Sequence, residues 1–214
     1  MLARQIDRLV YLAPNGANLE IFKPFDSGQS SFLIAYVGGL SLRGYYDLLP
    51  LLLAIRGVRA KLGVDVKLAV TDPIFDEFDK EVFEKFRDEL VYLELLDTKG
   101  VITLLSAFYV GVVSRVKYPL YDYAVPVKFY EYVATGLPLI MTANRGSELV
   151  KIMLENKLGL LCEPNDIKCL EKTLTRLVRN ERLLRGLRGN SISFRELIDG
   201  KIGAEVLFRA MSVY

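Results

Sequence analysis

Short apolar runs alternate with longer amphipathic segments from Phe32 onward, and this alternation constrains the fold more than any single motif. The runs have the length and unbroken apolarity of strands buried on both faces, and they cover Phe32–Val37, Val66–Val70, Leu90–Leu93, Tyr109–Val113, Leu137–Met141 and Gly159–Cys162. Helical segments separate and follow them, at about Tyr45–Leu62, Asp76–Arg87, Gly100–Ala107, Val127–Thr135, Ser147–Glu155 and Ile167–Arg179. The pattern predicts an α/β fold, a doubly wound Rossmann-like parallel sheet with right-handed crossovers and helices on both faces.

The two ends of the chain differ from this regular middle. The polar, glycine-containing stretch Asp26–Ser31 predicts where the compact domain begins, so residues 1–25 are interpreted as a lead-in linker segment. Residues 26–190 would then form the compact domain. Residues 191–214 are predicted to be one more helix, interrupted by Gly200 and Gly203.

The composition is typical of a globular domain. The 214 residues are 51% hydrophobic and 25% charged, and the formal net charge of +2 is too small to indicate nucleic acid as a partner. No uninterrupted apolar run approaches the ~20 residues of a membrane span, and the charged N-terminal residues do not match a signal peptide. We therefore expect a cytoplasmic protein.

Histidine is absent from the sequence, which excludes every mechanism that uses a histidine base and every zinc site built from cysteine and histidine. Cys162 and Cys169 are the only cysteines. We expect them to be separate buried thiols in a reducing compartment. We expect no metal site.

The stretch Pro126–Pro138 predicts a short helix that leads by a tight turn into a buried strand. Pro126 suits a helix entrance, where its missing N–H costs nothing, and Gly136 suits the left-handed position after the last turn. Lys128 and Glu131 share one face near the N-terminal end of this helix. A cation beside the positive end of a helix can hold a phosphate, and a carboxylate can accept hydrogen bonds from sugar hydroxyls. An ordinary surface ion pair explains the two residues equally well.

This stretch resembles the Pro-x-Lys-x-x-Glu-Tyr-x-Ala-x-Gly-x-Pro motif of retaining GT-B glycosyltransferases (group 1, family 4-like), in their C-terminal, donor-binding half. Three further stretches resemble the same half in the same order: Pro14–Pro24, Tyr36–Gly44 and Gly159–Asp166. The resemblance implies one half of a GT-B fold, with a nucleotide-diphosphate sugar as substrate and neither a metal nor another cofactor. It also implies that an N-terminal half or a partner subunit, absent from this chain, holds the acceptor.

The resemblance assigns the diphosphate to Lys128 and to the turn that follows the first strand. Gly38 and Gly39 form that turn, and glycines let a backbone come close to an anion. The family usually has an arginine where this chain has Gly39, and Arg43 matches the second family cation with a spacing one residue short. A glycine pair is more often a plain tight turn, and Arg43 equally suits a solvated position before the next helix.

The family's pair of acidic residues is matched only in part. Glu131 matches the second member, which contacts the ribose hydroxyls, whereas the first member falls on Tyr123. The adjacent Asp122 is a candidate replacement as a donor contact, although aspartates in loops usually form turns. Tyr123 is itself a candidate donor contact that could stack on a base or sugar, although tyrosines in such a loop are as often packed against the next domain. These departures keep open a second reading, a degenerate GT-B-like domain that binds a nucleotide or a protein without transferring sugar.

The resemblance implies that Lys128 and Arg43 stabilise the departing diphosphate, that Glu131 holds the ribose, and that the sugar keeps its anomeric configuration. Outside this site, Lys172, Arg176 and Arg179 form a basic stripe on one predicted helix. A solvated helix face explains the stripe most simply, and a weak peripheral contact with the inner face of a membrane is the alternative.

Overall fold

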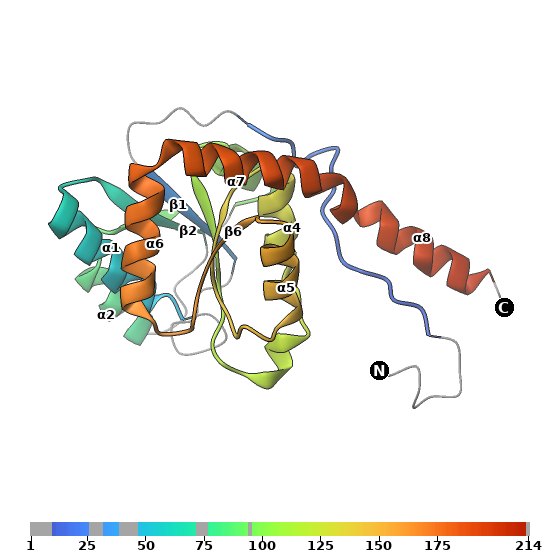
Figure 1. The fold of residues 1–214 in the computed structure, drawn as a ribbon, viewed down its shortest axis with the longest axis horizontal. Helices are drawn as coiled ribbons and strands as arrows, with labels where there is room; N and C mark the ends of the chain where they lie inside the picture. Colours follow the sequence, from blue (N-terminus) through green and yellow to red (C-terminus); the bar gives the residue numbers. More distant parts are fainter. Residues whose placement is uncertain (1–9, 26–31, 39–46, 72–76, 94–95, 213–214) are drawn as a thin grey trace.

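The computed structural model describes residues 10–25, 32–38, 47–71, 77–93 and 96–212 and contains a six-stranded, fully parallel sheet (Figure 1). The strand order is β3-β2-β1-β4-β5-β6. The strands are β1 (Phe32–Val37), β2 (Val66–Thr71), β3 (Leu90–Leu93), β4 (Val110–Ser114), β5 (Leu139–Thr142) and β6 (Gly159–Cys162). The predicted fold class is confirmed, because each predicted apolar run overlaps a strand of one parallel sheet.

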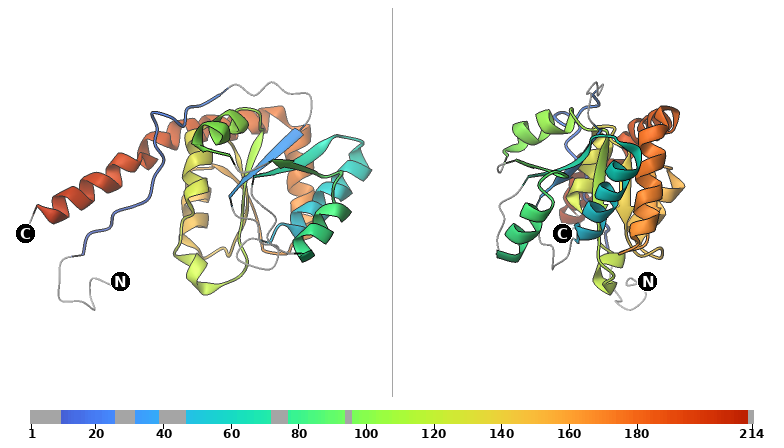
Figure 2. Two further views of the ribbon diagram at one scale, coloured as in Figure 1. Left: turned by 180° about the vertical axis from the view of Figure 1, so that it is seen from behind. Right: turned by 90° about the vertical axis from the view of Figure 1, so that its left-hand side faces the viewer.

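Helices cover both faces of the sheet, as predicted (Figures 1 and 2). They are α1 (Leu49–Leu62), α2 (Glu77–Lys85), α3 (Thr98–Leu105), α4 (Val127–Ala134), α5 (Glu148–Glu155), α6 (Ile167–Arg179), α7 (Glu181–Phe194) and α8 (Gly200–Met211), with 3-10 turns at Pro119–Asp122 and Arg195–Ile198. One face packs against α1, α2 and α6, and the opposite face packs against α3, α4 and α5.

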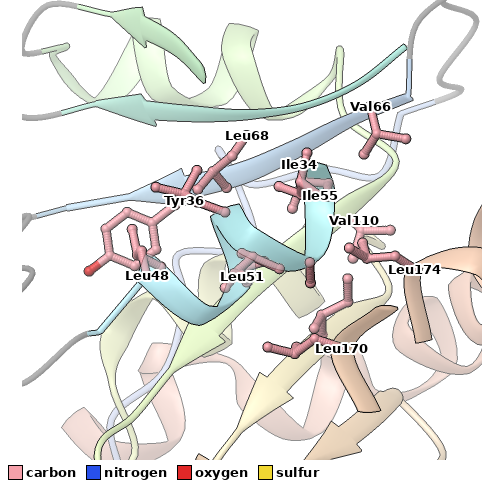
Figure 3. Close-up of a cluster of buried hydrophobic side chains, with 14 of the residues drawn as sticks. Ile34, Tyr36, Leu48, Leu51, Ile55, Val66, Leu68, Val110, Leu170 and Leu174 are labelled. Atoms are coloured by element: carbon pink, nitrogen blue, oxygen red, sulfur yellow. The ribbon is translucent and has the colours of Figure 1, made fainter. Parts of the chain in front are cut away.

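The core on the first face is mostly aliphatic (Figure 3). Leu51 and Ile55 of α1 and Leu170 and Leu174 of α6 pack over Ile34 of β1, and all are almost fully buried. The side chains of a strand alternate between the two faces, so Ala35 belongs to the core on the other face. The sheet is therefore buried on both sides, which explains its unbroken apolar strands.

Local sequence signals set the ends of several helices. Pro50 lies in the first turn of α1, and Gly63 ends that helix with a left-handed φ of +65°. Gly136 has φ +79° after α4, where its N–H bonds to the Val133 carbonyl and the next N–H bonds to the Tyr132 carbonyl. This left-handed end of α4 is the one that the sequence predicts.

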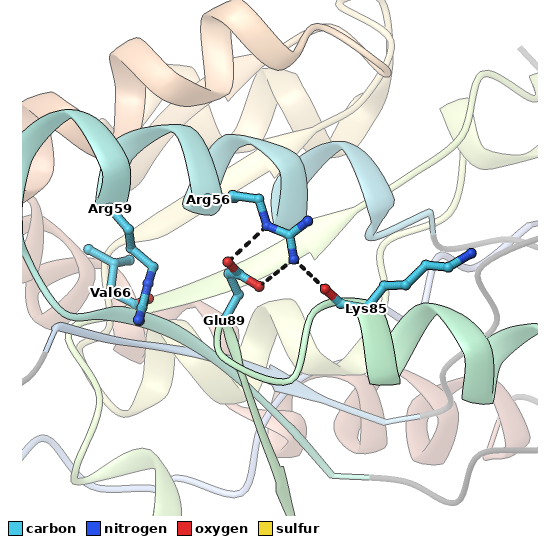
Figure 4. A network of polar contacts seen from close by, with 5 residues as sticks. All are labelled: Arg56, Arg59, Val66, Lys85 and Glu89. Carbon is cyan, nitrogen blue, oxygen red and sulfur yellow. Dashed lines mark hydrogen bonds and ion pairs between the residues drawn. The ribbon is translucent and has the colours of Figure 1, made fainter.

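An ion pair between the half-exposed Arg56 and the buried Glu89 joins α1 to the start of β3 (Figure 4). Arg56 donates through Nε and an NH₂ group to the two carboxylate oxygens of Glu89, at 3.0 and 2.9 Å, and also donates to the Lys85 carbonyl. The Arg56 guanidinium lies 4.0 Å from the centre of the Phe86 ring. The pKa of Arg56 is raised, chiefly because the guanidinium hydrogen-bonds to Glu89. The two charges stabilise each other, and we interpret the ion pair as a structural one.

The prediction for residues 191–214 is wrong in its detail. The helix α7 begins at Glu181, the chain bends at Arg195–Ile198, and α8 begins at Gly200, so the break precedes both glycines. Gly203 lies inside α8, where a Cβ would collide with the Pro14 carbonyl. A close approach of two chain segments, rather than a helix interruption, explains that glycine.

The prediction of two separate thiols is also wrong, because Cys162 and Cys169 form a disulfide with their Cα atoms 5.7 Å apart. The loop between them turns back through Asn165, whose φ is +67°. Asp166 then caps α6 by accepting a hydrogen bond from the Cys169 N–H. The first turn of α6 thus returns to the end of β6, which brings the two sulfurs together.

The lead-in segment packs against the C-terminal part of the chain (Figures 1 and 2). Ala17 donates its N–H to the Ile198 carbonyl and accepts a hydrogen bond from the Gly200 N–H. Ala17 and Phe22 are buried, whereas α8 projects from the body and exposes Leu207, Phe208 and Met211. No helix in the described ranges has both the length and the apolarity needed to cross a bilayer.

Candidate functional site

The sheet has a switch point between β1 and β4, where the strand order reverses. The β1 strand stays paired with β2 as far as Val37 and Thr71, but its pairing with β4 ends at Ala35 and Gly111. The two central strands therefore separate toward their carboxyl ends. In open parallel sheets, ligands bind at this edge and at this kind of point.

Gly38 and Lys128 meet at this edge. Gly38 follows β1 with φ +105°, and a Cβ built on it would lie 3.4 Å from Lys128 Nζ. The Lys128 ammonium also lies 3.8 Å from the centre of the Tyr36 ring, an arrangement that attracts a cation to the ring face. Lys128 is only 8% exposed, so its charge is held at the glycine turn rather than in bulk water.

Glu131 lies one turn further along α4 and is partly buried. Burial raises the pKa of its carboxyl above the ordinary value, and the positive charge of Lys128 opposes that rise. A carboxylate whose burial is not fully compensated is common in ligand sites, although structural groups can show the same shift.

Asp122 and Tyr123 lie on the loop between β4 and α4 and have different surroundings. The Asp122 carboxylate accepts hydrogen bonds from the Asn144 side chain at 3.1 and 3.2 Å, which ties this loop to the loop after β5. Tyr123 is 85% exposed. The other two predicted site residues, Gly39 and Arg43, lie outside the described residues.

A narrow hollow lies at the ends of β4 and β5, with about 10 Å³ open to the centre of a water molecule. The Ser114 hydroxyl donates to the Asp47 carbonyl at 2.6 Å and lies 3.1 Å from the Thr142 hydroxyl. Burial raises the pKa of the Asp47 carboxyl. Arg115 also lines the hollow and places its guanidinium 4.7 Å from the centre of the Tyr121 ring. The hollow has room for about one water rather than for a nucleotide.

Tyr132 also contacts the end of β1, and no role was predicted for it from the sequence. Its hydroxyl accepts a hydrogen bond from the Val37 N–H at 2.8 Å, and its side chain is fully buried. The quoted motif contains this tyrosine, but only the fold shows which backbone group it meets. No group of three or more acidic or sulfur ligands that could hold a metal occurs within the described ranges.

The basic stripe lies away from this edge. Lys172 and Arg176 of α6 line a surface groove of about 560 Å³ with Lys61 of α1, and Gly57 and Glu171 also line it. Arg179 is exposed at the end of α6. The stripe therefore follows the outer surface of the α1 and α6 layer.

No protein-family model and no curated protein matches this sequence. Solved structures do match. The sucrose-phosphate synthase of Thermosynechococcus elongatus is 18% identical with a TM-score of 0.66, over 94% of this chain and 52% of that chain. The C-terminal domain of LpcC, a group 1 family glycosyl transferase from Francisella tularensis, is 15% identical with a TM-score of 0.65, over 83% of this chain and 95% of that domain.

A third match is TarM of S. aureus, in a mutant form complexed with fondaparinux, α-GlcNAc-glycerol and UDP. It is 13% identical with a TM-score of 0.70, over 97% of this chain and 41% of that chain. This chain thus spans about half of the synthase but nearly the whole of the LpcC domain. At these identities the shared property is the fold. The chain has the α/β fold of the C-terminal domain of a group 1, GT-B glycosyltransferase.

Proposed function

We propose that this chain is the donor-binding half of a glycosyltransferase that takes sugar from a nucleotide diphosphate and transfers it with retention. One observation carries the proposal: the Lys128 ammonium lies against the Gly38 turn beside the switch point of the sheet. In the proposed complex the diphosphate meets a cation, a glycine turn and the amino-terminal end of α4 at one place. Each of these favours a bound phosphate.

Glu131 has a different part in the proposed complex. Its position on α4, one turn after Lys128, suits the ribose that is attached to the diphosphate. Ribose hydroxyls would donate hydrogen bonds to the carboxylate and so stabilise its ionised form, which burial disfavours in the free protein. Nucleotide binding is therefore expected to lower the pKa of Glu131.

The proposed reaction needs stabilisation of the departing diphosphate while the anomeric carbon gains oxocarbenium character. Fixed positive groups stabilise that developing charge best when they are already in place, and the packing of Lys128 against Tyr36 and Gly38 keeps it in place. We assign this role to Lys128 and Arg43 rather than to a metal ion.

The proposed acceptor-binding partner is an N-terminal half or a separate subunit. Exposed apolar side chains on α8 support a partner that covers this helix. Phe208 is 70% exposed, and Leu207 and Met211 lie nearby along the helix. Contiguous exposed apolar surface commonly marks a protein interface. The cleft for transfer would form between that partner and the carboxyl ends of the strands.

A degenerate binding domain is the second candidate function. Tyr123 stands where the resemblance implies an acidic residue, and the nearby Asp122 carboxylate is already bonded to Asn144. A domain that keeps Lys128 and Glu131 would bind the nucleotide but not support transfer. In that case nucleotide affinity would be unaffected by the attached sugar.

Calorimetric titration of the full 214-residue chain with nucleoside diphosphates and nucleotide sugars tests the proposal. We expect dissociation constants in the micromolar to millimolar range, with Lys128→Ala weakening binding about 30-fold. Lys151→Ala, which removes an exposed lysine of α5, is the matched control and should leave the affinity unchanged. Absence of binding by the wild-type chain across the panel would overturn the proposal.

A further inference from the structure

The hydrogen bond from the Val37 N–H to the Tyr132 hydroxyl joins two segments that are 95 residues apart in sequence. Val37 is the last residue of β1 and directly precedes the Gly38 turn. Tyr132 belongs to α4, the helix that also carries Lys128 and Glu131. One helix therefore supplies the two proposed ligand contacts and also holds the strand end that faces them.

The geometry of the sheet explains why Val37 needs this partner. The Phe32 N–H donates to the Asp65 carbonyl just before β2, whereas the Leu33 carbonyl accepts from the Tyr109 N–H just before β4. Because these directions alternate along a strand, the Val37 N–H points to the β4 side. The pairing of β1 with β4 has already ended at Ala35, so the backbone of β4 does not serve as its acceptor. The Tyr132 hydroxyl occupies that position.

Gly111 makes room for the tyrosine ring. A Cβ on Gly111 would lie 2.5 Å from Cδ2 of Tyr132, closer than two such carbons can approach. Gly111 is also the last β4 residue that pairs with β1. The ring thus lies where the two strands begin to separate. Burial raises the pKa of Tyr132, so the hydroxyl stays neutral near pH 7 and accepts the hydrogen bond as a phenol.

We propose that Tyr132 is a positioning residue that holds the Gly38 turn at a fixed place relative to Lys128. The ring packs over the face of β4 at Gly111, and the hydroxyl accepts the hydrogen bond from the Val37 N–H at the end of β1. Any effect of Tyr132 on nucleotide affinity rests on the proposed function. The effect of Tyr132 on the backbone at Val37 and Gly38 is independent of the proposed function.

The test is Tyr132→Phe, which removes only the hydroxyl, compared with Tyr130→Phe on the same helix. Tyr130 is 7% exposed and Tyr132 is fully buried, so the control removes the same hydroxyl from a less buried tyrosine of the same helix. We expect the Val37 amide to exchange with deuterium at least about tenfold faster in Tyr132→Phe only. The Gly38 N–H donates to the Thr71 hydroxyl at 3.4 Å, so its exchange should change less. We also expect about tenfold weaker binding of a nucleoside diphosphate, with wild-type affinity in Tyr130→Phe.

Unchanged exchange at Val37 in Tyr132→Phe would overturn the inference, whatever the binding result. If the wild-type chain binds no nucleotide, the proposed function fails, and the exchange comparison still decides the role of Tyr132. If Tyr132→Phe does not fold, the deuterium exchange of the Val37 amide in the wild-type chain tests the hydrogen bond instead. The Val37 amide should be protected as strongly as the interior amides of β1, and rapid exchange there would contradict the hydrogen bond.

Discussion

The two faces of the sheet use charged and polar groups in different ways. On the α1, α2 and α6 face, Arg56 and Glu89 bond to each other in a fork, and the core around α1 is aliphatic. On the α3, α4 and α5 face, α4 carries Lys128, Glu131 and Tyr132 toward the carboxyl ends of the strands. The buried Glu89 carboxylate has an arginine partner on the first face, whereas burial leaves the pKa of Glu131 raised on the second.

The difference between the two carboxylates distinguishes charged residues that stabilise the fold from those that suit a ligand. A buried carboxylate that is bonded to a bidentate arginine already has its charge and both oxygens paired, so a ligand would add little. A half-buried carboxylate with a raised pKa gains from any added donor, such as a sugar hydroxyl. Substitutions on the first face should therefore change folding stability and leave nucleotide binding alone, and substitutions on the second should show the opposite balance.

The largest effect is expected from Arg56→Ala. It leaves the Glu89 carboxylate buried without its partner, which should lower the free energy of unfolding by about 3 kcal/mol. Urea denaturation measures this change. Arg59→Ala is the control, because Arg59 pairs with the more exposed Asp65 and should cost less than about 1 kcal/mol. Equal losses for the two variants, or a loss of nucleotide affinity in Arg56→Ala, would break the comparison.

A smaller effect is expected from the disulfide between β6 and α6. Opening it with Cys169→Ser should lower the free energy of unfolding by about 2 kcal/mol, since the closed loop is short. A reducing agent should bring the wild-type chain to the same stability and leave the variant unchanged. If mass spectrometry after alkylation finds two free thiols in the unreduced wild type, the disulfide is refuted.

The smallest effect is the pH dependence that comes from Glu131. Because its native pKa is raised, the native state binds more protons than the unfolded state between the unfolded and the native pKa values. Stability should therefore fall as pH rises through that window, with the loss complete above the native pKa. Glu131→Gln should remove this shallow decrease in denaturation curves measured at several pH values. A decrease that persists in Glu131→Gln would assign it to another group.

The strands could be predicted from sequence because burial on both faces leaves an unbroken apolar run, as in Phe32–Val37. The helix α7 was not predicted, since Gly186 and Gly189 and a high charge content hide its apolar side. Lys128 and Glu131 could be proposed together because they are neighbours on one helix.

Contacts that depend on how the folded backbone turns could not be predicted in the same way. The spacing of Cys162 and Cys169 does not show that the loop between them turns back. The partner of Tyr132 lies on another strand, and the need for it appears only where β1 and β4 separate. Gly203 was misread for the same reason, because its neighbour Pro14 belongs to the lead-in segment.

The most direct test of the central claim compares a nucleoside diphosphate with the matching nucleoside, each titrated by calorimetry into wild type, Lys128→Ala and Glu131→Ala. If Lys128 holds the diphosphate, wild type should prefer the diphosphate by about 30-fold or more, and Lys128→Ala should lose most of that preference. Glu131→Ala should keep the preference and bind both ligands more weakly. A full preference for the diphosphate in Lys128→Ala would contradict the account.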